Sequence, residues 1–443
     1  MILTKDEARR ILETALKQSR AEETEISLSG GTHGNMRFAK NMPTTNGLAH
    51  TVNLSVTCAF GKKVGSFSTS EIDDASLTRA VHRAEEIAKL SPENPEYMPR
   101  LGAQTYLSPT EWDEVTATLA ADTRAETAAY AIKSAQEKEL IAAGYYENEG
   151  RFTAFANSRG AFAYRVATDA SYTLTMRTLD GTGSGWSAHD SFKASAIDGK
   201  RITTRAIEKA VRSRNPQSIA PGTYPVVLEH SAAGDMLNLF NGSLDRRGAD
   251  EGRSYFSDPK AGTKIGQHLF GDNITIMSDP MHGEVPSSPW GEDGLPLAPT
   301  TWVEKGVLKN LACSRFWAQE KKSNPLPGGS NIIMLGGEHS LDDLIASMDH
   351  GLLVTSFWYI REVDPTSILH TGLTRDGVFM IEKGKITTPV MNLRWNESPA
   401  AIYKCVEMMS TPERIVTREG NPPMMAPALL VKEFHFTSVS TSV

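Results

Sequence analysis

The chain has 443 residues, 40% of them hydrophobic and 22% charged, and its 46 Lys and Arg against 53 Asp and Glu give a formal net charge of −7. This composition excludes disordered and collagen-like proteins, and the length allows two or three domains with ordinary cores. The acidic balance gives no electrostatic basis for binding nucleic acid or an anionic membrane surface. Three widely spaced cysteines favour neither a disulfide framework nor a zinc finger. Since the sequence shows neither an apolar leader nor a run of about 18 apolar residues, we expect a cytoplasmic protein without membrane insertion.

Residues 1–92 are predicted to form one α+β unit. Apolar residues in 4–20 follow the i, i+3, i+4 spacing of an amphipathic helix, with Thr4 as a suitable N-cap. From residue 50 to 60 apolar and polar residues alternate, and a Gly-Lys turn leads into a second strand, which indicates an antiparallel hairpin. Helical spacing returns at 73–90 and ends before prolines. The order is helix, strands, helix.

A proline-bearing linker leads to a second α+β unit at 111–214. A helical segment at 111–139 precedes strand-like stretches, and a helix at about 195–213 closes the unit. The closing helices of both units share a short pattern, RAVHRA at 79–84 and RAIEKA at 205–210. We interpret the N-terminal half as a diverged duplication of a helix, an antiparallel sheet and a helix.

The remaining residues, 222–443, have a different composition. Short strand-like runs separated by turn signals dominate this region, including two similar hairpins around EKG sequences at 304–306 and 382–384. This pattern predicts a β-rich domain with a few short helices. The whole chain is therefore expected to be of the α+β class, with a duplicated N-terminal half and a β-rich C-terminal domain.

No strong catalytic motif occurs in the sequence, since HExxH, GxSxG, a P-loop and a well-placed GxGxxG are all missing. His339 close to Asp342 and Asp343 could ligate a metal. A simpler interpretation is that Ser340 caps a helix whose first turn carries acids. His350 would then lie at the C-terminal end of the same short helix. The other histidines have no partner at ligand spacing and are expected to be structural.

The densest polar cluster follows an apolar, helix-like run at 232–240. Its members are Asp245, Arg246, Arg247, Asp250, Glu251 and Arg253. Arginines can bind a peptide carboxylate through two hydrogen bonds, but mixed charges of this kind also form solvated faces and interface networks. We therefore expect the cluster either at a peptide cleft or at an interface.

Three stretches resemble the PmbA/TldD family, whose members are known as modulators of DNA gyrase and as metallopeptidase subunits. They are YPVVLE at 224–229, DEGRS at 250–254 and EKGKITTPV at 382–390. Their order and spacing agree with the family, and the resemblance covers nearly the whole chain.

The resemblance also implies where a metal site would lie. In TldD-like members, a helix after the VVL strand carries HExxxH, and a cysteine near the C-terminus is a further ligand. Counting without gaps from the VVL strand places Asn238 and Ser243 at the two histidines and Leu239 at the glutamate. Matching Arg418-Glu419-Gly420 places Val416 at the cysteine. These four side chains supply none of the donors that a catalytic zinc requires.

The chain thus resembles the PmbA branch of the family, also called TldE. This branch implies a subunit that holds no metal or other cofactor and pairs with a zinc-bearing TldD-like subunit around an enclosed chamber for small, unfolded or modified peptides. Alone, the chain is expected to form a homodimer and not to be catalytic. Asn238, Ser243 and the 245–253 cluster would line the vestigial cleft, or pack in the domain core or a dimer interface.

Two other functions remain open. The chain could be a stand-alone, metal-independent enzyme that uses Cys313, Cys405, or His339 with its two neighbouring aspartates. It could also be a peptide-binding or scaffolding module with an indirect effect on DNA gyrase, because its negative charge disfavours direct contact with DNA.

Overall fold

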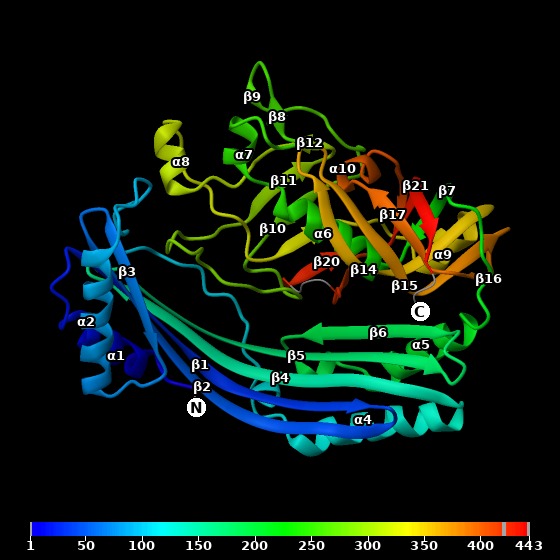
Figure 1. Ribbon diagram of the computed structural model, residues 1–443, viewed down its shortest axis with the longest axis horizontal. Helices are drawn as coiled ribbons and strands as arrows, with labels where there is room; N and C mark the ends of the chain where they lie inside the picture. Colours follow the sequence, from blue (N-terminus) through cyan, green and yellow to red (C-terminus); the bar gives the residue numbers. More distant parts are fainter. Residues whose placement is uncertain (1, 419–421, 441–443) are drawn as a thin grey trace.

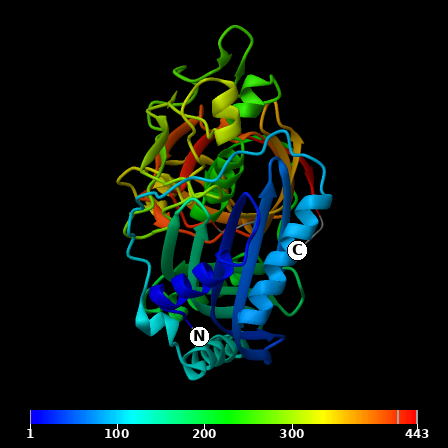
Figure 2. The same cartoon turned by 90° about the vertical axis from the view of Figure 1, so that its left-hand side faces the viewer.

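The computed structural model describes residues 2–418 and 422–440. It contains a long antiparallel sheet from the N-terminal half and a C-terminal domain that lies over one face of this sheet (Figure 1). In the perpendicular view, the dark-blue and cyan helices of the N-terminal half lie at the bottom and the yellow-to-red C-terminal domain at the top (Figure 2). Among the described residues, no helix is both long enough and apolar enough to cross a membrane.

The first unit has the predicted order of elements. They are α1 (Lys5–Leu16), β1 (Glu23–Ala39), β2 (Met42–Phe60), β3 (Lys63–Thr69) and α2 (Asp74–Leu90). Thr4 caps α1 through a capping box with Glu7, which confirms the predicted N-cap. The hairpin of β2 and β3 is also confirmed, and Gly61 in its turn has a φ of 56°. Strand β1 and the first half of β2 are elements that the sequence pattern does not predict.

The second unit differs from the prediction at its first helix. Its elements are α3 (Glu114–Ala117), α4 (Ala121–Glu137), β4 (Leu140–Asn157), β5 (Phe162–Thr178), β6 (Ser184–Ser191), a short 3₁₀ helix (Ala194–Ala196) and α5 (Gly199–Arg212). The segment 111–139 is therefore two helices and not one. The break is stabilised by Arg124 of α4, which donates a hydrogen bond at 3.1 Å to the carbonyl of Leu119.

The two N-terminal units share one continuous sheet with the order β3-β2-β1-β4-β5-β6. The central strands β1 and β4 are antiparallel, from Glu25 opposite Asn157 to Phe38 opposite Gly144. Alternate side chains of β1 point to one face, where α1 and α2 cover one end of the strands and α4 and α5 cover the other. On the opposite face Phe155 packs edge-on against Trp290 of the C-terminal domain.

The C-terminal domain is rich in β-strands, which completes the predicted α+β class. Its elements are β7 (Gly222–Leu228), α6 (His230–Gly242), α7 (Arg246–Asp250), β8 (Ser257–Asp258), β9 (Gly262–Thr263), β10 (Ile276–Ser278), β11 (Thr300–Glu304), β12 (Val307–Leu308), α8 (Arg315–Glu320), β13 (Ile332–Met334), α9 (Leu341–Ser347), β14 (His350–Asp364), β15 (Leu369–Glu382), β16 (Lys385–Val390), β17 (Leu393–Glu397), α10 (Pro399–Ile402), β18 (Val406–Met409), β19 (Glu413–Arg414), β20 (Met424–Ala426) and β21 (Leu429–Val439). Both predicted EKG hairpins are confirmed, as β11–β12 and β15–β16.

Five strands of this domain close into a barrel. The pairings run β14–β7–β21–β17–β15 and return from β15 to β14. A second sheet has the order β12-β11-β10-β13-β20-β19. Helix α6 contacts strands of both the barrel and the second sheet, and its buried residues belong to the largest core of the molecule. This helix is the element on which the resemblance places the metal motif.

The structure corrects the prediction for His350. Helix α9 ends at Ser347, and His350 is the exposed first residue of β14. The helix ends because Met348 is extended and because the turn between β15 and β16 binds the following backbone. There the N–H of Lys383 donates to the carbonyl of Asp349 at 2.6 Å, and the N–H of Gly384 donates to that of Met348 at 2.9 Å. His350 therefore lies outside the helix, in the first position of a strand.

Candidate functional site

The positions that we align with the HExxxH motif lie at the C-terminal end of α6. Asn238 and Leu239 are half-buried in its last turns. Ser243 is the C-cap residue, directly after the helix, and its hydroxyl donates a hydrogen bond at 3.2 Å to the carbonyl of Leu239. The three positions are therefore neighbours in space at one end of the helix.

Val416 lies near the other end of α6. It is buried, and its carbonyl accepts a hydrogen bond at 3.1 Å from the hydroxyl of Ser231 in the first turn. The residues on either side of Val416 lie within contact distance of the position that a Cβ on Gly234 would occupy. The structure thus places Val416 beside the first two turns of the helix. Glu419 and Gly420, which carry part of the alignment of Val416, lie outside the described residues.

The side chains at these four positions do not fit a zinc ion. Zinc sites in proteins use imidazole nitrogen, thiolate sulfur and carboxylate oxygen, whereas these residues offer an amide, a hydroxyl and two alkyl groups. Within residues 2–418 and 422–440, no group of three or more His, Cys, Asp and Glu residues is arranged to hold a metal. We therefore derive no chemical step through a metal bound to this chain.

The polar cluster at 245–253 forms a network of ion pairs centred on Arg247. Asp245 caps α7 by accepting hydrogen bonds from the backbone N–H groups of residues 247 and 248. The Arg247 guanidinium makes two hydrogen bonds of 2.8 Å to Glu96 and one of 3.0 Å to Glu251. These bonds hold the pKa values of both glutamates below their usual range. Arg253 also donates to Glu251, at 2.7 Å.

The other two members of the cluster face a different neighbour. Arg246 lies 3.5 Å from Asp250, which also accepts a hydrogen bond of 2.8 Å from the indole of Trp317. Because Glu96 belongs to the linker between the N-terminal units, the cluster attaches this linker to the C-terminal domain. A contact between the cluster and a peptide stays a prediction.

The residues suggested for a stand-alone enzyme lie in two kinds of surroundings. Burial raises the pKa of the Cys313 and Cys405 thiols, which disfavours the reactive thiolate. Ser340 caps α9 in a capping box with Asp343, and hydrogen bonds from Ser340 lower the pKa of that carboxyl group. Asp343 therefore stabilises a helix terminus, and the charge of the nearby, exposed His339 is a smaller cause of its lowered pKa.

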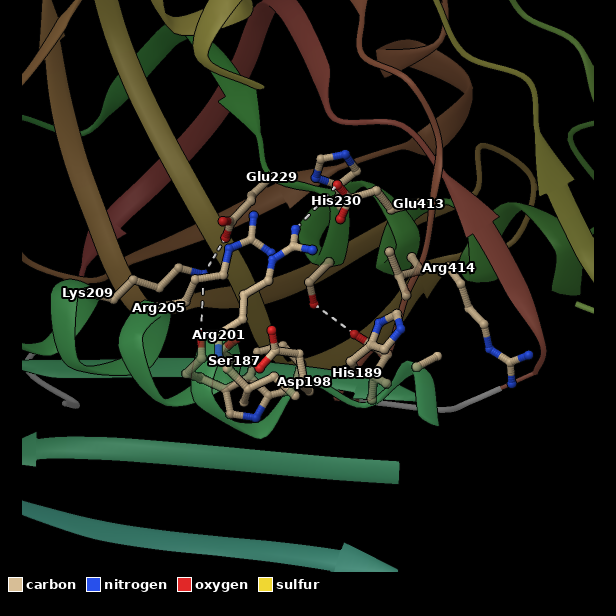
Figure 3. A pocket seen from close by; sticks show the side chains of 17 residues that line it. Ser187, His189, Asp198, Arg201, Arg205, Lys209, Glu229, His230, Glu413 and Arg414 are labelled. Carbon is tan, nitrogen blue, oxygen red and sulfur yellow. Dashed lines mark hydrogen bonds and ion pairs between the residues drawn. The ribbon is translucent and has the colours of Figure 1, made fainter. Parts of the chain in front are cut away.

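The structure reveals a cavity of about 110 Å³ that the sequence did not indicate (Figure 3). Its walls come from the edge strand β6, the helix α5, the start of α6 and the segment around β19. Its charged and imidazole side chains are those of His189, Asp198, Arg201, Arg205, Lys209, Glu229, His230, Glu413 and Arg414. Val416 also lines it, so the cavity adjoins the N-terminal end of the helix that carries the three positions aligned with HExxxH.

Three cations of the cavity come from one face of α5 at spacings of four residues, namely Arg201, Arg205 and Lys209. Lys209 is 2.5 Å from a carboxylate oxygen of Glu229 and also donates to the carbonyl of Trp186. Arg201 lies 3.9 Å from Glu413. Arg205 is half-buried and has no ion pair or hydrogen bond to any residue that the structure describes.

Two histidines face the same cavity. Burial lowers the pKa values of His189 and His230, so both imidazoles are mainly neutral at pH 7. The Nε2 atom of His230 lies 3.0 Å from the hydroxyl of Ser410. The cavity therefore combines one unpaired cation with neutral imidazoles.

Arg414 joins the cavity to the long sheet. Its buried guanidinium donates two hydrogen bonds to Asp190 of β6, at 3.1 and 2.9 Å, and one of 2.6 Å to the carbonyl of Glu284. A further contact of 3.3 Å reaches Asp169 of β5. Burial and the neighbouring Asp190 carboxylate raise the pKa of Asp169 to about 7. These contacts connect the C-terminal domain with the edge of the sheet.

Comparison with protein families matches three profiles to this chain. Residues 24–88 match the PmbA/TldA metallopeptidase domain 1, residues 111–214 the central domain, and residues 221–438 the C-terminal domain. A metalloprotease TldD homolog from Buchnera aphidicola is 28% identical over 239 residues, which are 50% of this chain and 47% of that protein. A metalloprotease from Methanothermobacter thermautotrophicus is 23% identical over 288 residues, 59% of this chain and 61% of that protein. The chain thus spans less than two thirds of the length of these relatives.

Solved structures share the fold along nearly the whole chain. TldE from Thermococcus kodakarensis superposes with a TM-score of 0.85 at 16% identity and covers 97% of this chain and 99% of its own. A putative modulator of a DNA gyrase from Thermotoga maritima superposes with a TM-score of 0.83 at 18% identity, covering 98% and 100%. Such identities establish the fold alone. The three profiles, which together account for most of the sequence, show that this chain belongs to the PmbA/TldD family.

Proposed function

We propose that this chain is the subunit of a TldD/TldE-type metallopeptidase that does not bind the metal. The observation that carries the proposal is the set of side chains at the aligned metal positions, since Asn238, Leu239, Ser243 and Val416 supply no zinc donor. The superposition on TldE supports the same assignment. The zinc and the general base belong to a TldD-like partner, and the two subunits together hydrolyse small, unfolded or modified peptides.

The chain's own contribution is to form part of the peptide chamber. Strand β6 is the last strand of the long sheet, and one of its edges has no ladder partner among the described strands. The carbonyl of Trp186 points to that edge, because Lys209 of α5 donates a hydrogen bond to it. In an antiparallel strand the N–H and C=O of Ala188 then point the same way. A peptide strand can bind there through main-chain hydrogen bonds, which gives broad sequence tolerance.

The test is the metal content and peptidase activity of the purified chain. After equilibration with zinc and desalting, we expect less than about a tenth of an equivalent of zinc and no peptide cleavage. Adding a TldD-like subunit should produce a complex that contains zinc and cleaves the peptide. Asn238→Ala should leave the zinc content of the complex unchanged, because the metal belongs to the partner. Stoichiometric zinc in the chain alone would overturn the proposal.

A further inference from the structure

We propose that the cavity between α5 and α6 binds a carboxylate group, that of a peptide C-terminus, with Arg205 as its main contact. The inference rests on the proposed function for the source of the ligand, since a chamber for small peptides contains free C-termini. The location of the cavity supports this source, because residues 186–189 of β6, whose outer edge has no ladder partner among the described strands, form one of its walls.

The first argument is the balance of charges inside the cavity. Each carboxylate in the lining has a partner within the chain: Glu229 pairs with Lys209 and Glu413 pairs with Arg201. Asp198 caps α5 and accepts hydrogen bonds from two backbone N–H groups of its first turn. Arg414 is bound to Asp190 and Asp169, outside the lining. Among the described residues of the lining, Arg205 is the one cation left without an anion.

The second argument is the shape of this unpaired cation. A guanidinium presents parallel N–H groups that match the two oxygens of a carboxylate. Arg205 lies in the middle of the basic row of α5 and points into the cavity together with Arg201 (Figure 3). Because Arg205 is half-buried, water screens its charge less than at an open surface. A planar monoanion therefore satisfies the site better than a neutral group.

The third argument is the N-terminal end of α6, whose residues 229–231 line the same cavity. Glu229 is its N-cap residue, but the Glu229 side chain makes no capping hydrogen bond, and no acid occurs in the first turn. The carboxylate of Glu229 is instead engaged by Lys209. Helix N–H groups without a capping partner favour a nearby anion, and here they supplement the arginine.

The experiment is calorimetric titration of the full chain with N-acetyl-Ala-Ala-Ala as the free acid and as the C-terminal amide. The two peptides differ only at the carboxylate, and we expect the acid to bind at least about tenfold more tightly. Acetate and inorganic phosphate serve as additional probes. If either binds as tightly as the peptide acid, the site is a general anion site and the assignment to a peptide terminus is wrong.

Arg205→Gln should weaken binding of the acid about tenfold or more and leave that of the amide unchanged. Arg212→Gln is the matched control, because Arg212 is an exposed arginine of the same helix that does not line the cavity. Arg205→Lys, which keeps the charge but not the planar fork, should give an intermediate affinity. Equal affinities for acid and amide, or equal effects of Arg205→Gln and Arg212→Gln, would overturn the inference.

The outcomes separate this inference from the proposed function. If the complex with a TldD-like subunit cleaves peptides but the acid and the amide bind equally, only the carboxylate site fails. If the acid binds but the chain itself holds stoichiometric zinc, only the assignment as the non-metal subunit fails.

Discussion

The two ends of α6 have opposite surroundings. At the C-terminal end, Phe240 packs edge-on against the rings of Phe256, Phe270 and Tyr403 within the largest hydrophobic cluster. At the N-terminal end, Glu229 and His230 face a cavity lined by charged side chains. The end that carries the three positions aligned with HExxxH is thus filled by aromatic packing, whereas the polar end, which lies beside Val416, adjoins the cavity. The positions aligned with HExxxH and the cavity therefore lie at opposite ends of one helix.

Removing an aromatic ring from the packed end should give the largest loss of stability. Phe240→Ala is expected to lower the free energy of unfolding by about 3–5 kcal/mol, because Phe240 is fully buried and its truncation leaves a cavity. Denaturant unfolding measures the change. Leu239→Ala is the control. Leu239 is next to Phe240 but only half-buried, so its truncation should lower the free energy of unfolding clearly less. Equal losses of stability in the two variants would show that the aromatic cluster around Phe240 is not the main source of stability at this end of α6.

At the polar end of α6, we expect ion pairs to contribute more to stability than hydrophobic packing does. Arg414→Met is expected to cost about 2–4 kcal/mol, because it leaves the half-buried carboxylate of Asp190 without its partner. Arg201→Met is the control and should cost less than about 1 kcal/mol, since the Arg201 and Glu413 side chains are exposed. Thermal unfolding compares both variants with the wild type, and an Arg414→Met variant as stable as Arg201→Met would show that the Arg414 contacts contribute little.

The Arg414 network should also make stability depend on pH through Asp169. The pKa of Asp169 is about 7 in the folded chain, against a usual value of 3.8. At pH values between 3.8 and about 7, the folded state therefore binds more protons than the unfolded state. This group therefore lowers stability as pH rises through that window. Asp169→Asn keeps an oxygen acceptor for Arg414 but does not titrate. The stability of this variant relative to wild type should increase from pH 5 to pH 8 in thermal unfolding.

The control for this pH effect is Asp180→Asn. Asp180 is an exposed carboxylate whose pKa is lowered by hydrogen bonds from Thr178 and Thr182. Its contribution to stability is present above its unfolded pKa and is lost as pH falls through the folded value. The difference between Asp180→Asn and wild type should therefore be constant from pH 5 to pH 8. A constant difference for Asp169→Asn as well would contradict the raised pKa of Asp169.

The smallest effect is expected from the hydrogen bond that joins the first turn of α6 to Val416. Ser231→Ala should cost about 1 kcal/mol or less, because one neutral hydrogen bond is lost and Ser231 is only half-buried. Denaturant unfolding measures this change, and a loss as large as that of Phe240→Ala would show that the polar end is packed as tightly as the other.

Local signals in the sequence were sufficient for much of the fold. Helix caps and hairpin turns depend on neighbouring residues, so Thr4 and the two EKG turns were predicted correctly. Strand β1 was missed because it contains glycines, which usually weaken a strand. In the structure, a Cβ at Gly30 would lie 2.5 Å from the carbonyl oxygen of residue 51, and one at Gly31 would lie 2.3 Å from that of residue 150. Glycine is required at these two positions because the backbones of the neighbouring strands, which are distant in the sequence, leave no room for a Cβ atom.

The cavity could not be predicted for the same reason. Its walls come from four separate segments, at 186–189, 196–209, 229–231 and 413–416, and their contact depends on the packing of the C-terminal domain against the long sheet. The local signal is the basic spacing within RAIEKA, which by itself indicates only a duplication. Ion pairing decides which of these cations is unpaired, and it becomes visible only in three dimensions.

The pairing of β1 with β4 also has a consequence for synthesis of the chain on the ribosome. Ile26 pairs with Ala156, so β1 leaves the ribosome long before its partner on one side exists. The hairpin partners β2 and β3 are available early, but the other edge of β1 remains open during this interval. Such distant pairings slow folding, and an open strand edge favours association with other chains. Nascent chains that end before residue 140 should therefore depend on chaperones more than the finished protein does.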